Sequence, residues 1–142
     1  MSKVAPTVDV DRLLESKDLD VCLGYLSRIS GIDAALLYNH EGWVMAAGEE
    51  THEDSRIEAP YLLSQFQETL HHFKNLGLGP MEQSLVLGGQ KFHLVVNLDR
   101  TGLFFLVVSG VRGSYDLYKH RIERGVQALG DLLRKRGYLR GG

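Results

Sequence analysis

Residues 83–109 read QSLVLGGQKFHLVVNLDRTGLFFLVVS. They contain three apolar runs of strand length, which are separated by turn residues. The pair Gly88-Gly89 predicts a tight hairpin turn, because both residues can adopt positive φ. Residues 103–109 are largely apolar on both faces, which predicts a central strand that is covered from both sides. Because hairpins join antiparallel strands, this region predicts an antiparallel sheet.

A second hairpin is predicted nearer the N-terminus. Residues 34–38 and 43–47 form two short apolar runs. The polar residues 39–42 lie between them and include an Asn and a Gly, which favour a tight turn. The chain therefore supplies five strands in two antiparallel groups.

Three helices are predicted from apolar residues that recur every three or four positions. Residues 19–29 mark the first helix and residues 114–135 mark the last. The middle helix is marked by residues 59–73, and Asp54 or Ser55 is its expected N-cap. The predicted fold is α+β, a five-stranded antiparallel sheet flanked by helices in the order αββαβββα.

Length and composition agree with one folded domain. The chain has 142 residues, of which 44% are hydrophobic and 24% are charged, as in average globular proteins. We expect an N-terminal arm over residues 1–16, a domain over residues 17–137 and a tail over residues 138–142. No apolar run approaches the roughly 20 residues that span a bilayer, and the start lacks a signal-peptide pattern. With Cys22 as its only cysteine, we expect a cytoplasmic protein without membrane insertion.

Charge is divided unevenly along the chain. Residues 1–111 contain 8 Lys and Arg against 15 Asp and Glu, whereas residues 112–142 contain 8 against 3. The last helix is therefore basic, but it matches no motif that reads nucleic-acid grooves. A basic run is more often a solvated face, so we expect no nucleic-acid binding.

The first hairpin carries a family resemblance. Residues 31–46 read GIDAALLYNHEGWVMA, which resembles the first hairpin of the roadblock/dynein light chain family: a small-apolar strand, a polar turn closed by Gly, and a second apolar strand. Residues 89–109 resemble the final hairpin of that family. The resemblance covers nearly all of residues 17–135 and is to the bacterial MglB-like members in particular. Similar hairpins occur in longin, profilin and PAS or GAF domains.

The resemblance implies a roadblock- or profilin-like sheet with the middle helix on one face and the terminal helices on the other. Family members pair their third strands edge to edge and pack their middle helices together, which here means residues 83–87 and 59–73. The function implied is a non-enzymatic homodimeric adaptor or regulator that binds a Ras-like small GTPase. The expected dimer or partner interface consists of Leu62, Leu63, Phe66, Leu70, Phe73, Leu85 and Leu87.

Two features of the residues themselves agree with a dimer. The middle helix has more apolar side chains than one sheet face needs. An unprotected edge strand also invites pairing, which a symmetric dimer would satisfy.

No residue pattern predicts a catalytic, cofactor-binding or metal site. His71 and His72 are adjacent on a helix and point about 100° apart, so they cannot easily share one metal ion, with or without His93. No Gly-x-Ser-x-Gly frame positions a nucleophile. The glycines at 77–79 and 88–89 do not follow a strand and open a helix, so we interpret them as turn residues rather than phosphate loops.

Two smaller features and one alternative function complete the prediction. We expect Trp43 to be a partly buried packing residue, and a partner contact is the alternative. The ending Arg140-Gly141-Gly142 resembles the tail of ubiquitin-like modifiers, but we expect a frayed end. The alternative function is a PAS- or GAF-like small-ligand sensor, which would require a pocket with convergent polar groups.

Overall fold

The computed structural model describes residues 17–137. Its helices and strands follow the predicted order, and the expected arm and tail lie outside the described residues. The elements are α2 (Lys17–Ser27), β1 (Ile32–Asn39), β2 (Val44–Ala47), α3 (Glu53–Asn75), β3 (Gln83–Leu87), β4 (Lys91–Asn97), the short 3-10 turn η1 (Leu98–Arg100), β5 (Phe104–Val111) and α4 (Arg112–Lys135).

All five strands belong to one antiparallel sheet in the order β2-β1-β5-β4-β3. The central strand is β5, in which every residue except Val111 is buried. Its neighbours are β1, where Leu36 pairs with Val107, and β4, where Val95 pairs with the same residue. The prediction of a central strand covered from both sides is therefore confirmed. The sheet ends at β2 on one side and at β3 on the other.

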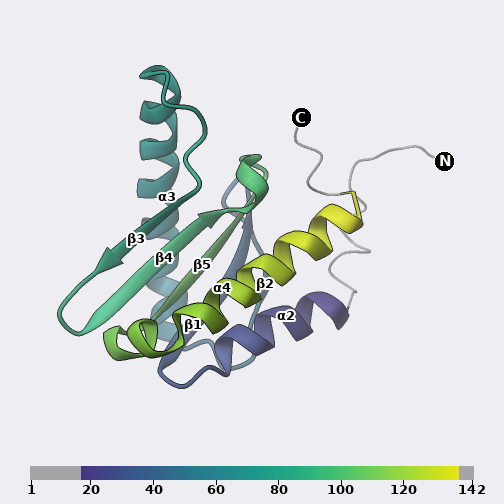
Figure 1. The fold of residues 1–142 in the computed structure, drawn as a ribbon, viewed down its shortest axis with the longest axis vertical. Helices are drawn as coiled ribbons and strands as arrows, with labels where there is room; N and C mark the ends of the chain where they lie inside the picture. The colour runs from purple at the N-terminus through teal and green to yellow at the C-terminus, as the bar shows by residue number, and fades with distance from the viewer. Residues whose placement is uncertain (1–16, 138–142) are drawn as a thin grey trace.

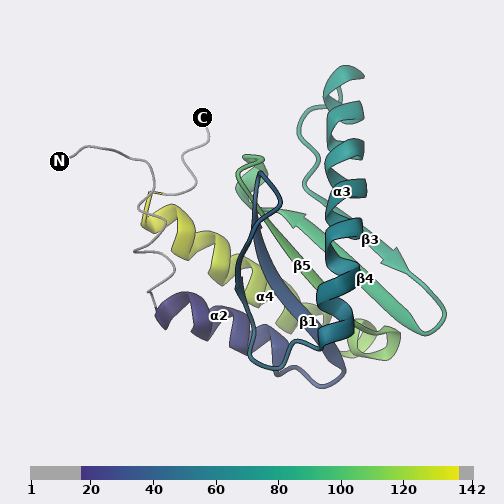
Figure 2. The same cartoon turned by 180° about the vertical axis from the view of Figure 1, so that it is seen from behind.

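Helices cover the sheet on both faces, as Figures 1 and 2 show from opposite sides. On one face α2 and α4 lie side by side and bury a cluster that includes Leu23, Leu106 and Leu129. On the other face α3 lies alone, and Leu63 and Phe66 pack against the sheet. Burial of each such side chain stabilises the fold by about 1.5–3 kcal/mol. The division into one helix and two helices is the one that the resemblance implied.

The predicted hairpin is present over residues 83–97, although neither Gly88 nor Gly89 adopts the positive φ that was the reason for expecting it. The predicted start of α3 is wrong. The N-cap of α3 is His52, whose side chain makes no capping hydrogen bond, and both predicted caps lie inside the helix. The His52 N–H instead donates to the backbone oxygen of Asp33 at 2.7 Å. This bond to β1 fixes where α3 begins, and helical periodicity does not contain that information.

Within residues 17–137, no helix is both long enough and apolar enough to cross a membrane.

Candidate protein-interaction surface

The middle of the inner face of α3 is occupied by contacts within the chain. Ala59, Leu63 and Phe66 are buried against the sheet. The Phe66 ring meets the Phe105 ring edge to face, with 5.8 Å between the ring centroids. Two of the predicted interface residues, Leu63 and Phe66, thus contribute to the core of the subunit. Because they are already buried, they can support an interface only by holding α3 in place.

The outer side of α3 exposes apolar residues that no part of residues 17–137 covers. Ile57 is 64% exposed and Tyr61 is 73% exposed. They lie one helical turn apart, so their side chains share one face of α3. Leu62, Leu70 and Phe73 are partly buried along the margins of the helix. The accessible apolar side chains of α3 therefore include Ile57 and Tyr61, which the predicted interface omitted.

Strand β3 is an edge strand, and its side chains are largely accessible. Among residues 17–137, it pairs only with β4. Val86 is 55% exposed and Leu87 is 42% exposed, whereas Leu85 is partly buried toward α4. Antiparallel pairing alternates bonded and non-bonded positions. Since Gly88 N–H donates to Lys91 and Asn97 N–H donates to Glu82, the N–H groups of residues 83, 85 and 87 point away from β4.

A shallow cavity of about 140 Å³ lies where α3 meets β3 and β4. Leu62 and Thr69 line it from the helix, and Val86 and His93 line it from the sheet. The Nδ1 atom of His93 is buried without a hydrogen-bond partner. Buried polar atoms normally have a hydrogen-bond partner, and residues 17–137 supply none to this atom. We call Ile57, Tyr61, Leu62 and Val86 the α3–β3 surface; Leu87 lies on the α4 face of the sheet, as Leu85 does, because side chains alternate along a strand.

The C-terminal half of α3 stands clear of the strands in both views (Figures 1 and 2). An open cavity of about 740 Å³ lies beneath it. Its walls are formed by Leu70 and Lys74 of the helix, Pro80 of the returning loop and Phe105 of the sheet. Phe73, another predicted interface residue, is partly buried in this part of the helix.

Charge along α3 is polarised. Its first two turns contain Glu53, Asp54 and Glu58 against one cation, Arg56. Its last two turns contain His71, His72 and Lys74 beside the acidic residue Glu68. These charges follow the helix macrodipole, which stabilises anions at the N-terminus and cations at the C-terminus. With neutral histidines, the first two turns of the helix are net negative, whereas Glu68 and Lys74 balance each other near its C-terminal end.

Trp43 differs from its prediction as a partly buried packing residue. It lies at the β1–β2 turn and is 68% exposed. Its backbone N–H donates to the Asn39 side chain at 3.0 Å, so the turn is held by backbone contacts and not by the indole ring. Gly42, with φ of +88°, closes the same turn and leaves the ring pointing away from the core.

The described titratable groups do not form a metal cluster. Within residues 17–137, no three His, Cys, Asp or Glu side chains lie close enough to hold an ion. The ring centroids of His71 and His72 are 6.5 Å apart. Burial raises the pKa of the Cys22 thiol above its usual range, with a smaller contribution from Asp18, which disfavours the reactive thiolate. Burial likewise raises the pKa of Tyr38.

The class of protein is defined by one antiparallel sheet that has one helix on one face and two helices on the other. The third strand of this sheet lies at its edge. The chain has the roadblock fold. It is similar to a Roadblock/LC7 domain from Streptomyces avermitilis at 18% sequence identity, over 81% of this chain and 97% of that one, with a TM-score of 0.62.

Within that class, MglB structures are also similar to the chain. MglB of Myxococcus xanthus gives a TM-score of 0.70 at 15% identity, over 85% of this chain and 98% of that one. The gliding protein MglB of Thermus thermophilus gives 0.68 at 18% identity, over 95% and 96%. The fold is therefore roadblock/MglB-like. Neither the protein-family models nor the curated proteins searched match the sequence.

Proposed function

We propose that this chain is a non-enzymatic, cytoplasmic adaptor or regulator that forms a homodimer and binds a Ras-like small GTPase without a cofactor. The observation that carries the proposal is the α3–β3 surface, an apolar helix flank beside an unpaired strand edge. Likeness to MglB structures supports it, and one of these is described as MglB with a tetrameric arrangement, which is self-association of that protein. Self-pairing would satisfy both the strand edge and the exposed side chains at once.

The strand edge favours a second copy of the same chain. The outward N–H groups of residues 83, 85 and 87 are available to backbone acceptors of another strand. Two antiparallel copies of β3 supply such acceptors to each other about a two-fold axis. The pairing would extend the sheet across both subunits and place the exposed Val86 of each copy beside the joined edges, on the α3 face of the sheet.

The charges of α3 favour the same arrangement. If two α3 helices pack antiparallel, the acidic end of each lies beside the end that contains His71, His72 and Lys74. Parallel packing would place like charges together. The polarity of α3 therefore selects the orientation that a two-fold axis through the β3 edges also requires.

A proline variant tests the strand pairing. Leu85→Pro removes an outward N–H and leaves the N–H groups that face β4 in place, and proline is tolerated on edge strands. Leu85→Ala is the matched control, because it removes the side chain but keeps the N–H. By size-exclusion chromatography with light scattering, we expect the wild type and the alanine variant at twice the 15.9 kDa chain mass. The dimer of the proline variant should dissociate at protein concentrations at least about tenfold higher than those at which the wild-type dimer dissociates.

Two results would contradict the dimer. A wild-type chain that stays monomeric at micromolar concentration removes it altogether. If Leu85→Pro dimerises as tightly as Leu85→Ala, β3 pairing is wrong and another surface joins the subunits. Tyr61→Asp separates these cases, because Tyr61 is exposed and its substitution should weaken an α3 contact without unfolding the chain.

The GTPase partner needs its own test. Purified Ras-like GTPases from the source organism, loaded with GDP or with a non-hydrolysable GTP analogue, are titrated into the chain by calorimetry. We expect one of them to bind, with different affinities in its two nucleotide states, because its switch segments change conformation. An absence of binding for every such GTPase contradicts the partner and leaves the dimer result unaffected.

A small-ligand sensor of the PAS or GAF kind is less well supported. Large apolar side chains fill both faces of the sheet, including Leu106 on one side and Phe105 on the other. The two cavities described for α3 lie between that helix and the sheet or loop beside it, and both are open at the surface. A metabolite that raised the melting temperature strongly would favour the sensor over the adaptor.

A further inference from the structure

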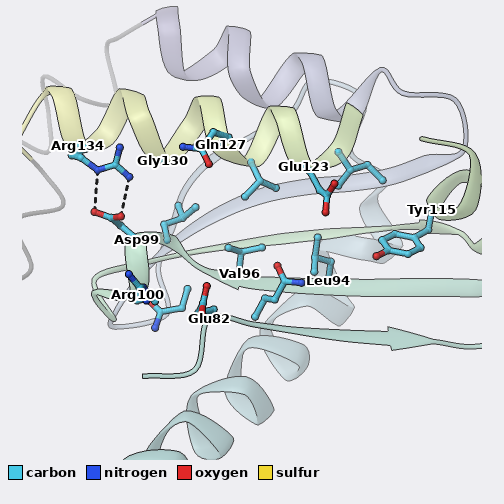
Figure 3. A pocket seen from close by; sticks show the side chains of 15 residues that line it. Glu82, Leu94, Val96, Asp99, Arg100, Tyr115, Glu123, Gln127, Gly130 and Arg134 are labelled. Atoms are coloured by element: carbon cyan, nitrogen blue, oxygen red, sulfur yellow. Dashed lines mark hydrogen bonds and ion pairs between the residues drawn. The ribbon is translucent and has the colours of Figure 1, made fainter. Parts of the chain in front are cut away.

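A groove of about 460 Å³ lies on the face of the sheet opposite α3, between α4 and the strands β3 and β4 (Figure 3). Leu94 and Val96 form its floor in Figure 3, and Ile122 and Val126 of α4 also line it. The groove exists because α2 and α4 cover only part of this face, and β3 extends beyond them. Leu94 and Val96 are 5% and 8% exposed, so residues 17–137 already cover most of this floor and leave a small apolar strip accessible.

Two glycines of α4 differ in whether another helix packs against them. A Cβ atom at Gly125 would lie 2.5 Å from the Leu26 side chain, so this glycine allows α2 to approach α4 closely. Gly130 lies five residues later, which places it about 140° further around the helix. It lines the groove, and a Cβ atom there would meet nothing within 4 Å.

Gly130 is not required by the packing of the described residues. A glycine within a helix costs about 0.5–1 kcal/mol relative to alanine. At Gly125 the contact with α2 offsets this cost, whereas the space into which a Cβ atom at Gly130 would point is empty. The space beside Gly130 thus resembles the one that α2 fills beside Gly125, but no helix of residues 17–137 packs into it.

The charges around the groove indicate the character of its occupant. At one end Arg134 donates to Asp99 at 2.9 and 3.1 Å and to Asp131 at 2.8 Å, so its charge is compensated. Arg100 lies at the same end. Figure 3 shows Glu123 projecting from α4 toward the middle of the groove, whereas Glu82 lies on the strand side and nearer to Arg100.

These two carboxylates are weakly compensated. Glu82 makes no ion pair within residues 17–137, and Glu123 meets only the exposed His120, at 3.5 Å. The groove therefore combines an apolar floor with one carboxylate on the α4 side and one on the strand side. This arrangement is complementary to a basic segment that has one apolar side.

We propose that this groove docks an amphipathic helix of a partner protein, with a large aliphatic side chain seated at Gly130 and basic side chains beside Glu82 and Glu123. The helix would lie along α4 on the flank opposite α2 and would complete the helical layer over β4 and β3. Helix-in-groove recognition of this type uses apolar anchors three or four residues apart. The site lies on the other face of the sheet from α3 and does not depend on the dimer or on a GTPase.

The test uses the full chain and a defined probe, a fluorescein-labelled 18-residue helical peptide with leucines on one face and lysines flanking them. Binding is followed by fluorescence anisotropy. A peptide with glutamates in place of the lysines is the charge control. We expect the lysine peptide to bind and the glutamate peptide to bind at least about tenfold more weakly, because Glu82 and Glu123 would repel it.

Substitutions in the chain locate the site. Gly130→Leu fills the space beside Gly130 and should weaken binding of the lysine peptide at least about tenfold. Gly113→Leu is the matched control, since Gly113 also lies in α4 and is exposed, but does not line the groove. Glu123→Lys should also weaken binding, whereas Glu41→Lys, an equal charge change at the β1–β2 turn, should have a much smaller effect.

The outcomes decide the proposal in both directions. Loss of binding in Gly130→Leu, with a melting temperature no lower than that of the wild type, supports it. No binding of the lysine peptide, equal binding of the two peptides, or unchanged binding in Gly130→Leu would overturn it. If Gly130→Leu instead alters the oligomeric state of the chain without peptide, the occupant is a second copy and the partner assignment fails.

Discussion

The two faces of the sheet are closed to different extents. On the face of α2 and α4, the helices lock together: Gly125 receives Leu26, and the Arg121 guanidinium lies 5.7 Å from the Tyr25 ring centroid. On the other face, α3 is alone, and apolar side chains remain accessible on its outer side and along β3. The comparison separates residues that hold the fold from residues that are free to bind, even where both lie on one helix.

The largest expected effect compares two aromatic residues of α3. Phe66→Ala removes a buried ring that packs on Phe105, and we expect it to lower the free energy of unfolding by about 3–5 kcal/mol. Tyr61→Ala removes an exposed ring and should change the stability of the isolated subunit by less than about 0.5 kcal/mol. Urea unfolding at low protein concentration measures both.

The same pair of variants distinguishes core from interface at higher concentration. If Tyr61 contributes to a dimer, the destabilisation caused by Tyr61→Ala should grow with protein concentration, because dimerisation stabilises the folded state by mass action. The effect of Phe66→Ala should remain large at every concentration. Equal losses for both variants at low concentration would show that the outer side of α3 is not free.

These residues also show what the sequence can predict. Alternating and helical patterns correctly predicted five strands, three helices and β5 as the central strand. They also placed an excess of apolar side chains on α3. Periodicity cannot divide that excess between core and surface, since Leu62, Leu63 and Phe66 lie within one wide stripe. Only the position of α3 over the sheet decides that Leu63 and Phe66 face inward.

Single residues in turns were harder to predict for a related reason. The start of α3 depends on the bond from His52 to Asp33, two residues that are distant in the sequence. The exposure of Trp43 depends on where the β1–β2 turn projects relative to the rest of the sheet. The groove at Gly130 depends on how far α4 lies from β3. Each of these is a tertiary relation, so local sequence patterns contain little information about it.

An intermediate effect, with opposite signs, is expected for the two glycines of α4. Gly125→Ala places a methyl group against the buried Leu26 side chain and should destabilise the chain by about 1–3 kcal/mol. Gly130→Ala meets no atom and should stabilise it by about 0.5–1 kcal/mol through helix propensity. Thermal unfolding of both variants beside the wild type measures the difference. A loss of stability in Gly130→Ala would mean that the groove flank of α4 is closed after all.

The smallest expected effect concerns the ion pair between Arg134 of α4 and Asp99 of η1. Hydrogen bonds from Arg134 lower the pKa of Asp99, and its side chain remains one-third exposed. Asp99 has φ of 55°, a left-handed conformation that asparagine also tolerates, so Asp99→Asn removes the charge without straining the backbone. We expect the substitution to cost about 0.2–1 kcal/mol at pH 7, as for other exposed pairs.

The pH dependence of this cost has a definite sign. Because the folded-state pKa of Asp99 is lowered, its contribution is complete above the unfolded-state value of about 3.9 and is lost as the pH falls through the folded-state value. The stability difference between the wild type and Asp99→Asn should therefore be constant near neutral pH and shrink below about pH 4. Urea unfolding across this range measures it, and added salt should reduce it, since the pair is exposed. If the stability difference between the wild type and Asp99→Asn grew on acidification, the anionic form of Asp99 would be destabilising. Packing alone would then hold α4 over η1.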